Sequence, residues 1–167
     1  MGEKPTEREK KLDALFADLK DAKEEAKIRL IIKEIWAIWM DSGRADVDEL
    51  MVEGSNAMAA GKVDDALKAY NDVIEKMPEF AEGWNKRATV FFNLGDLESA
   101  KKDIEKTLSI EKRHFGALSG LISIYRAMND KVSALKIFGE LLDIYPHYPG
   151  LNKGINALYE ELGMTRT

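Results

Sequence analysis

The chain has 167 residues, 45% of them hydrophobic, with a formal net charge of −5 and an isoelectric point near 5.2. This length and composition suit one compact domain or one short repeat array, and the acidic balance argues against binding to nucleic-acid backbone or anionic lipid. The sequence has no cysteine, which excludes disulfides, catalytic thiolates and thiolate metal sites.

The first residues, 1–11, are mostly charged or polar, so we expect them to fray and find no apolar stretch typical of a signal peptide. A first helix is predicted over 7–22, where Leu12, Leu15, Phe16 and Leu19 follow helical spacing.

A second helix is predicted over 25–41, and its apolar residues cover roughly 200° of the circumference, wider than the stripe of about 100° that a surface helix needs. We therefore expect it to pack between helix 7–22 and the element that follows. The alternative is that Trp36 or Trp39 is exposed and mediates self-association. The run from Ile28 to Met40 is too short to span a bilayer.

Beyond this helix, three sets of residues recur every 34 positions: Ala66, Ala100 and Ala134; Gly61, Gly95 and Asn129; and Leu50, Trp84 and Leu118. Glycine and asparagine readily adopt the left-handed conformation that ends a helix. Each unit is therefore predicted as a helix, a tight turn, a second helix and a stop assisted by proline, as at Pro78 and Pro146. The predicted helices are 46–60, 63–76, 80–94, 97–110, 114–128 and 131–145.

The repeat resembles the tetratricopeptide repeat (TPR), with Trp84, Ala88 and Phe91 in the first helix of one unit and an alanine opening each second helix. Ile122 and Lys112 depart from the family pattern. The resemblance implies an all-α, right-handed superhelix with repeats at 47–80, 81–114 and 115–148, preceded by a degenerate helical pair within 1–46.

The last segment, 149–167, is predicted to hold a capping helix, because Leu151, Ile155, Leu158 and Leu162 form one apolar face that ends at Gly163. The stretches 35–39, 81–89 and 113–118 also resemble a group of small alphaproteobacterial TPR proteins, many of them exported. This resemblance leaves the compartment open between cytoplasm and, if a signal peptide was removed, periplasm.

In TPR arrays the first helix of each repeat lines a concave groove. The residues predicted to face a bound peptide there are Met51, Ser55, Met58, Asn85, Lys86, Thr89, Phe92, Asn93, Gly116, Ser119, Gly120, Ser123 and Arg126. Glycine inside a helix costs about 0.8–1 kcal/mol relative to alanine, so the nearly bare face of the third repeat indicates a close approach. Either a neighbouring helix of the array or a bound segment could make it.

Some TPR proteins grip chaperone C-termini with a clamp of lysine, asparagine and arginine side chains. The matching positions here are Met51, Ser55, Lys86, Gly116 and Gly120, which provide a single cation. The resemblance therefore does not extend to a chaperone-tail adaptor of that type.

The sequence shows no catalytic, metal-binding or phosphate-cradling motif, and His114 and His147 are both interpreted as turn residues. We therefore expect a non-enzymatic scaffold without cofactor or metal that binds a protein or peptide in its groove. Two alternatives remain: a structural protein that self-assembles through its tryptophan-rich N-terminal helices, and a small-ligand binder with an unrecognised site.

Overall fold

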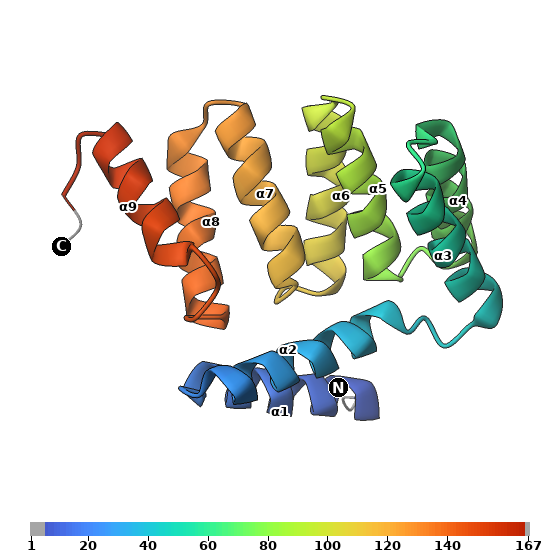
Figure 1. Cartoon of the computed structure of the whole chain (residues 1–167), viewed down its shortest axis with the longest axis horizontal. Helices are drawn as coiled ribbons and strands as arrows, with labels where there is room; N and C mark the ends of the chain where they lie inside the picture. The colour runs from blue at the N-terminus through green and yellow to red at the C-terminus, as the bar shows by residue number, and fades with distance from the viewer. Residues whose placement is uncertain (1–5, 166–167) are drawn as a thin grey trace, which may run out of the picture.

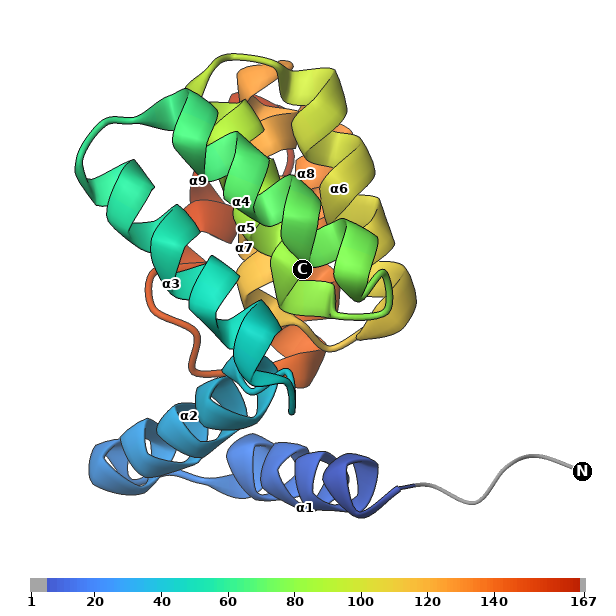
Figure 2. The same cartoon turned by 90° about the vertical axis from the view of Figure 1, so that its right-hand side faces the viewer.

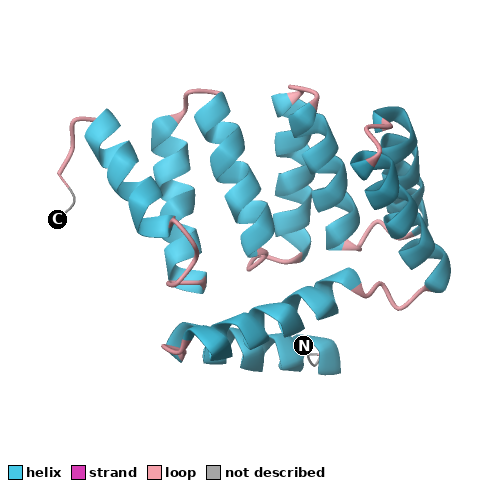
Figure 3. Cartoon of the chain, viewed as in Figure 1, coloured by secondary structure: helices cyan, strands magenta, loops and turns pink. Residues whose placement is uncertain are grey.

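The computed structural model describes residues 6–165, and every regular element within them is an α-helix (Figures 1 and 3). The helices are α1 (Glu7–Asp21), α2 (Glu25–Met40), α3 (Ala45–Ala59), α4 (Val63–Lys76), α5 (Ala81–Asn93), α6 (Leu97–Ile110), α7 (Phe115–Ala127), α8 (Lys131–Ile144) and α9 (Leu151–Glu161). The predicted helices are confirmed, with ends that differ by two residues or fewer.

The predicted fraying of residues 1–11 is wrong for residues 6–11, and residues 1–5 lie outside the described part of the chain. Thr6 caps α1: its hydroxyl accepts from the Glu9 backbone N–H at 3.2 Å, and the Glu9 carboxylate accepts from the Thr6 backbone N–H. This reciprocal capping box fixes the first turn of the helix.

Three helical pairs, α3–α4, α5–α6 and α7–α8, stand side by side in chain order, and α9 covers the end of the row (Figure 1). As expected, the turn inside each pair contains a residue with positive φ: Gly61 at 71°, Gly95 at 78° and Asn129 at 59°. The aspartates that follow two of these turns cap the next helix. At Asp130, hydrogen bonds from the Ser133 hydroxyl and backbone N–H lower the pKa of the carboxyl group.

Small residues allow the two helices of a pair to approach closely. Ala66, Ala100 and Ala134 are completely buried. At Gly54 of α3, an added Cβ would lie 2.5 Å from the ring of Tyr70 on α4, so only glycine fits at this position without a shift of the ring.

The N-terminal helices α1 and α2 form the expected pair, but they do not continue the row of repeats. They lie crosswise at one end of the helical pairs in both views (Figures 1 and 2). Outside the hairpin, the α2 backbone approaches α5, its Trp36 and Trp39 pack on Phe115 of α7, and α1 contacts α8. The predicted packing of α2 against the first repeat is therefore wrong. The segment 41–44, with Gly43 at φ 73°, turns the chain between α2 and α3.

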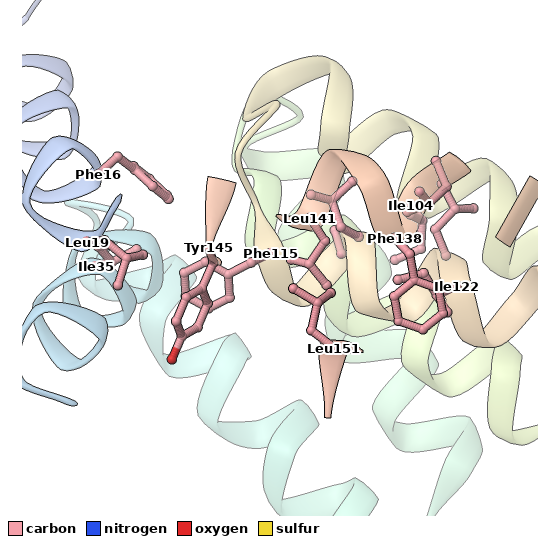
Figure 4. Packing of buried hydrophobic residues seen from close by; sticks show 14 of the residues in the cluster. Phe16, Leu19, Ile35, Ile104, Phe115, Ile122, Phe138, Leu141, Tyr145 and Leu151 are labelled. Carbon is pink, nitrogen blue, oxygen red and sulfur yellow. The ribbon is translucent and has the colours of Figure 1, made fainter. Parts of the chain in front are cut away.

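Two hydrophobic clusters result from this arrangement. The larger joins the hairpin to α5–α9. Figure 4 shows Phe16, Leu19 and Ile35 of the hairpin on the side of Tyr145 and Phe115, with Leu141 further along the cluster. The smaller belongs to the first repeat and reaches α5 through Val90. Trp39 is 3% exposed and lies in the larger cluster, so the predicted alternative of an exposed tryptophan does not apply to it.

A glycine in a turn and a glycine inside a helix predict substitutions with opposite effects on stability. Gly95→Ala should lower the free energy of unfolding by about 1–2 kcal/mol, because a Cβ disfavours the left-handed conformation. Gly139→Ala, inside α8 with open space around the site, should raise it by about 0.5–1 kcal/mol. Urea unfolding followed by circular dichroism measures both, and equal effects of the two substitutions would contradict the assignment.

Candidate functional site

A hollow of about 270 Å³ lies between α5 and α7. The residues around it are Trp36, Asn85, Ala88, Thr89, Phe92, Ile104, Gly116, Gly120, Ser123 and Ile124. Six of them belong to the predicted groove set: Asn85, Thr89, Phe92, Gly116, Gly120 and Ser123. From Asn85 to Phe92 the lining follows two turns of α5, a length of about 10 Å at 1.5 Å per residue.

The two glycines of the hollow have different neighbours. A Cβ on Gly116 would lie 2.9 Å from Cη2 of Trp36, so the close approach expected at this glycine is made by the protein's own N-terminal hairpin. A Cβ on Gly120 would lie 3.4 Å from Cδ1 of Ile104, which is an ordinary contact. At Gly120 and Ser123, part of the nearly bare face of α7 is therefore not covered by the hairpin.

The polar groups of the hollow already bond within their own helices. Asn85 Nδ2 donates to Glu82 Oε2 at 3.1 Å, and the hydroxyls of Thr89 and Ser123 donate to backbone carbonyls four residues earlier, each at 3.1 Å. Each hydroxyl oxygen keeps lone pairs that can accept a hydrogen bond. The hollow thus combines apolar walls with acceptors along its length.

The remaining predicted residues of the third repeat lie around a neighbouring hollow of about 220 Å³, formed by α7, α8 and the segment before α9. Ser119 and Arg126 line it, and Ser123 borders both hollows. Arg126 is exposed and lies 3.8 Å from the Glu161 carboxylate of α9.

Two predicted residues of the second repeat lie outside both hollows. Lys86 is half-buried, and its Nζ is 3.3 Å from Glu82 Oε1. Asn93, the last residue of α5, is exposed.

The predicted residues of the first repeat do not reach the hollow. Met51 is 2% exposed and packs with Tyr70 and Val90, because the second repeat covers it; its predicted role at the groove surface is wrong. Met58 is partly buried against the same cluster. Ser55 is exposed, and its hydroxyl donates to the Met51 carbonyl at 2.9 Å.

A buried polar pair lies next to the hollow and corrects the interpretation of His114 as a turn residue in solvent. His114 and Glu82 are both completely buried. The backbone N–H of Ala117 donates to His114 Nδ1 at 3.0 Å, so the ring proton is on Nε2, which donates to Glu82 Oε2 at 2.9 Å. Trp39 stacks on the imidazole with ring centroids 4.1 Å apart and planes at 12°.

The carboxylate of Glu82 is unevenly paired. Oε2 accepts from His114 and from Asn85, whereas Oε1 makes no hydrogen bond within residues 6–165. Lys86 Nζ lies 3.3 Å from Oε1, close enough for ionic attraction but outside hydrogen-bond geometry. This attraction partly compensates the burial of the charge.

Sequence reasoning did not include Trp36, Ala88, Ile104 and Ile124 in the lining. Their helical spacing marks Ala88, Ile104 and Ile124 as core positions, and they lie at the floor where the core meets the hollow. For Trp36 the only signal was the bare face of α7 around Gly116, which indicated a close neighbour without naming it.

Few charged side chains occupy the groove positions. The positions that the TPR resemblance assigns to a carboxylate clamp carry one cation, Lys86, which is already beside Glu82.

Within residues 6–165, no cluster of three metal-ligating side chains occurs. In the same part of the chain, no helix has the length and apolar character needed to cross a membrane.

Stacked pairs of antiparallel helices with an inner hollow define a helical-repeat protein. The tetratricopeptide-repeat sequence profile matches residues 81–114 and 117–148. A TPR repeat-containing protein of Rhizobium etli is 38% identical over 157 residues, which cover 94% of this chain and 77% of that protein. The chain belongs to the TPR family, and its fold is the all-α TPR superhelix.

Solved structures that share this fold include a peptide-bound domain and MamA. The first TPR domain of RPAP3 (Spaghetti), bound to the Hsp90 peptide SRMEEVD, has a TM-score of 0.67 and 19% identity over 71% of this chain and 96% of that domain. The crystal structure of MamA has a TM-score of 0.67 and 18% identity, and the match covers 97% of this chain and 88% of that one.

The buried pair predicts a large effect of His114→Ala. This substitution removes the cap of α7 and one partner of the buried Glu82 carboxylate, so it should lower the free energy of unfolding by about 3 kcal/mol. Glu82→Gln retains an acceptor for His114 and should cost about 1 kcal/mol.

Chemical denaturation, followed by tryptophan fluorescence because Trp39 stacks on the imidazole, measures both changes. A loss below about 0.5 kcal/mol for His114→Ala, the size of an ordinary surface substitution, would show that the pair does not stabilise the fold.

Proposed function

We propose that the chain is a non-enzymatic protein-interaction module that binds a peptide or helix of a partner protein in the hollow between α5 and α7. The observation that carries the proposal is the convergence there of six groove residues from two neighbouring repeats. Their spacing along α5 and α7 suits a segment lying along or across the two helices.

The chemistry of the hollow supports a binding role over a catalytic one. None of its lining residues is an acid, a lysine, an arginine or a histidine, so the hollow holds no group that could transfer a proton near neutral pH. The walls from Trp36, Phe92 and Ile124 offer apolar contact, and Thr89 and Ser123 offer acceptors for a backbone N–H.

The similar fold of the RPAP3 domain, bound to an Hsp90 peptide, supports a peptide as the ligand class. The clamp positions of this chain differ, because Met51 is buried and Gly116 and Gly120 have no side chain to pair with a carboxylate. The proposed ligand is therefore not an acidic C-terminal tail, and its recognition depends on apolar contact.

The alternatives have weaker support. Self-assembly through the N-terminal tryptophans would need their rings on the outer surface, but Trp39 is buried and the half-buried Trp36 lines the hollow. A small-ligand site usually occupies about 300–1,000 Å³, and this hollow, at about 270 Å³, lies just below that range.

Filling the hollow tests the proposal. A peptide is first selected on the full chain from a random display library, and its Kd is measured by calorimetry. Ser123→Trp places an indole in the hollow and should weaken binding at least tenfold with helicity unchanged. Glu140→Trp, an exposed change on α8, is the matched control and should leave the Kd within twofold. Failure to select any peptide, or equal Kd values for both variants, would refute the groove as the binding site.

A further inference from the structure

The N-terminal hairpin contributes directly to the hollow, because Trp36 of α2 is one of its walls. The ring is half-buried and held edge-on by three aromatic neighbours: its centroid lies 5.4 Å from Trp39, 5.6 Å from His114 and 5.6 Å from Phe115. These three ring contacts fix the orientation of the indole, and part of its surface lines the hollow.

The repeats leave space for this indole at one position only. Asp48, Glu82 and Gly116 occupy the equivalent position near the start of the first helix in successive repeats, at intervals of 34 residues. Only the third repeat has no side chain there, and a Cβ on Gly116 would already lie 2.9 Å from the indole. The hairpin therefore enters the inner face of the array at the third repeat.

Trp36 closes the hollow at the end where α5 and α7 begin. Gly116, the second residue of α7, lies against the indole, Asn85 lines the hollow from the second turn of α5, and Phe92 is two turns further along α5. The result is a slot about 10 Å long, with an indole at one end, a phenyl ring at the other and Gly120 in its wall. Its volume of about 270 Å³ suits one bulky side chain rather than a drug-sized ligand.

The charges around the slot are already paired. Lys86 lies beside Glu82, and Arg126 is 3.8 Å from Glu161, so each cation already has an acidic neighbour within the protein. An aromatic or long aliphatic side chain matches the apolar walls, whereas a charged side chain would lose its hydration without gaining a partner.

From these observations, and resting on the proposed function, we infer that Trp36 contacts the ligand and that the partner is a protein segment with one bulky apolar anchor. The anchor, an aromatic residue, leucine or methionine, inserts between Trp36 and Phe92. Because the hairpin blocks the slot beyond Trp36, the bound segment leaves the inner face there instead of following the array along its full length. The hairpin thereby determines ligand choice.

The test uses the full chain and the peptide selected above. Trp36→Ala should weaken binding at least tenfold, Trp36→Phe by threefold or less, and replacement of the peptide's largest apolar residue by alanine at least tenfold. Leu30→Ala, an exposed change on the same helix, is the matched control and should leave the Kd within twofold. Binding should shift the tryptophan emission of the wild type, and this shift should disappear in Trp36→Phe, which retains Trp39 and Trp84.

The outcomes separate the two proposals. If Trp36→Ala binds within twofold of wild type while Ser123→Trp does not bind, the groove function stands and the role of Trp36 is refuted. If neither variant changes the Kd, both proposals fail. A preference for acidic peptides without an apolar anchor would overturn the assigned ligand class. Light scattering tests whether the wild type is a dimer. If it is, and if Ser123→Trp is a monomer, a second copy of the chain and not a partner peptide occupies the hollow.

Discussion

The stacking of Trp39 on His114 joins the N-terminal hairpin to the repeats, and the form of the inner face depends on it. Two hydrogen bonds hold the imidazole in one orientation, one from the backbone at the start of α7 and the other to Glu82 on α5. The fixed ring therefore offers Trp39 a surface on which to stack. Aromatic pairs of this kind contribute about 0.5–1.5 kcal/mol beyond the area that they bury. Trp36 rests on the same group of rings, so the buried pair also fixes one wall of the hollow.

Much of the fold could be predicted from the sequence because its signals are local. The turn residues Gly61, Gly95 and Asn129 adopt the left-handed conformation that their chemistry permits, and the helices between them follow the expected periodicity. About half of the candidate groove was also predictable, because the side of a helix that faces inward repeats with the 34-residue period. These features depend on neighbours within one repeat or the next.

The features that sequence reasoning missed depend on contacts between distant segments. His114 lies between a charged and an aromatic residue at the end of a repeat, and nothing local shows that Trp39 covers it. The TPR resemblance placed α2 in a degenerate helical pair before the repeats, whereas segment 41–44 directs it across the array. Met51 has the position of a groove residue, but packing against Val90 of the next repeat buries it.

The crosswise hairpin also changes the topology of contacts in the array. In a simple solenoid each repeat contacts only its neighbours, so stability is approximately a sum of local terms. Here Arg113 bonds to Asp13 across 100 residues of sequence. The larger cluster combines residues that precede the first repeat in the sequence with residues that follow it. Such long-range closure raises the relative contact order, which slows folding. It also places residues from both ends of the chain in one hydrophobic core. The protein should therefore fold less like a row of independent units than its period suggests.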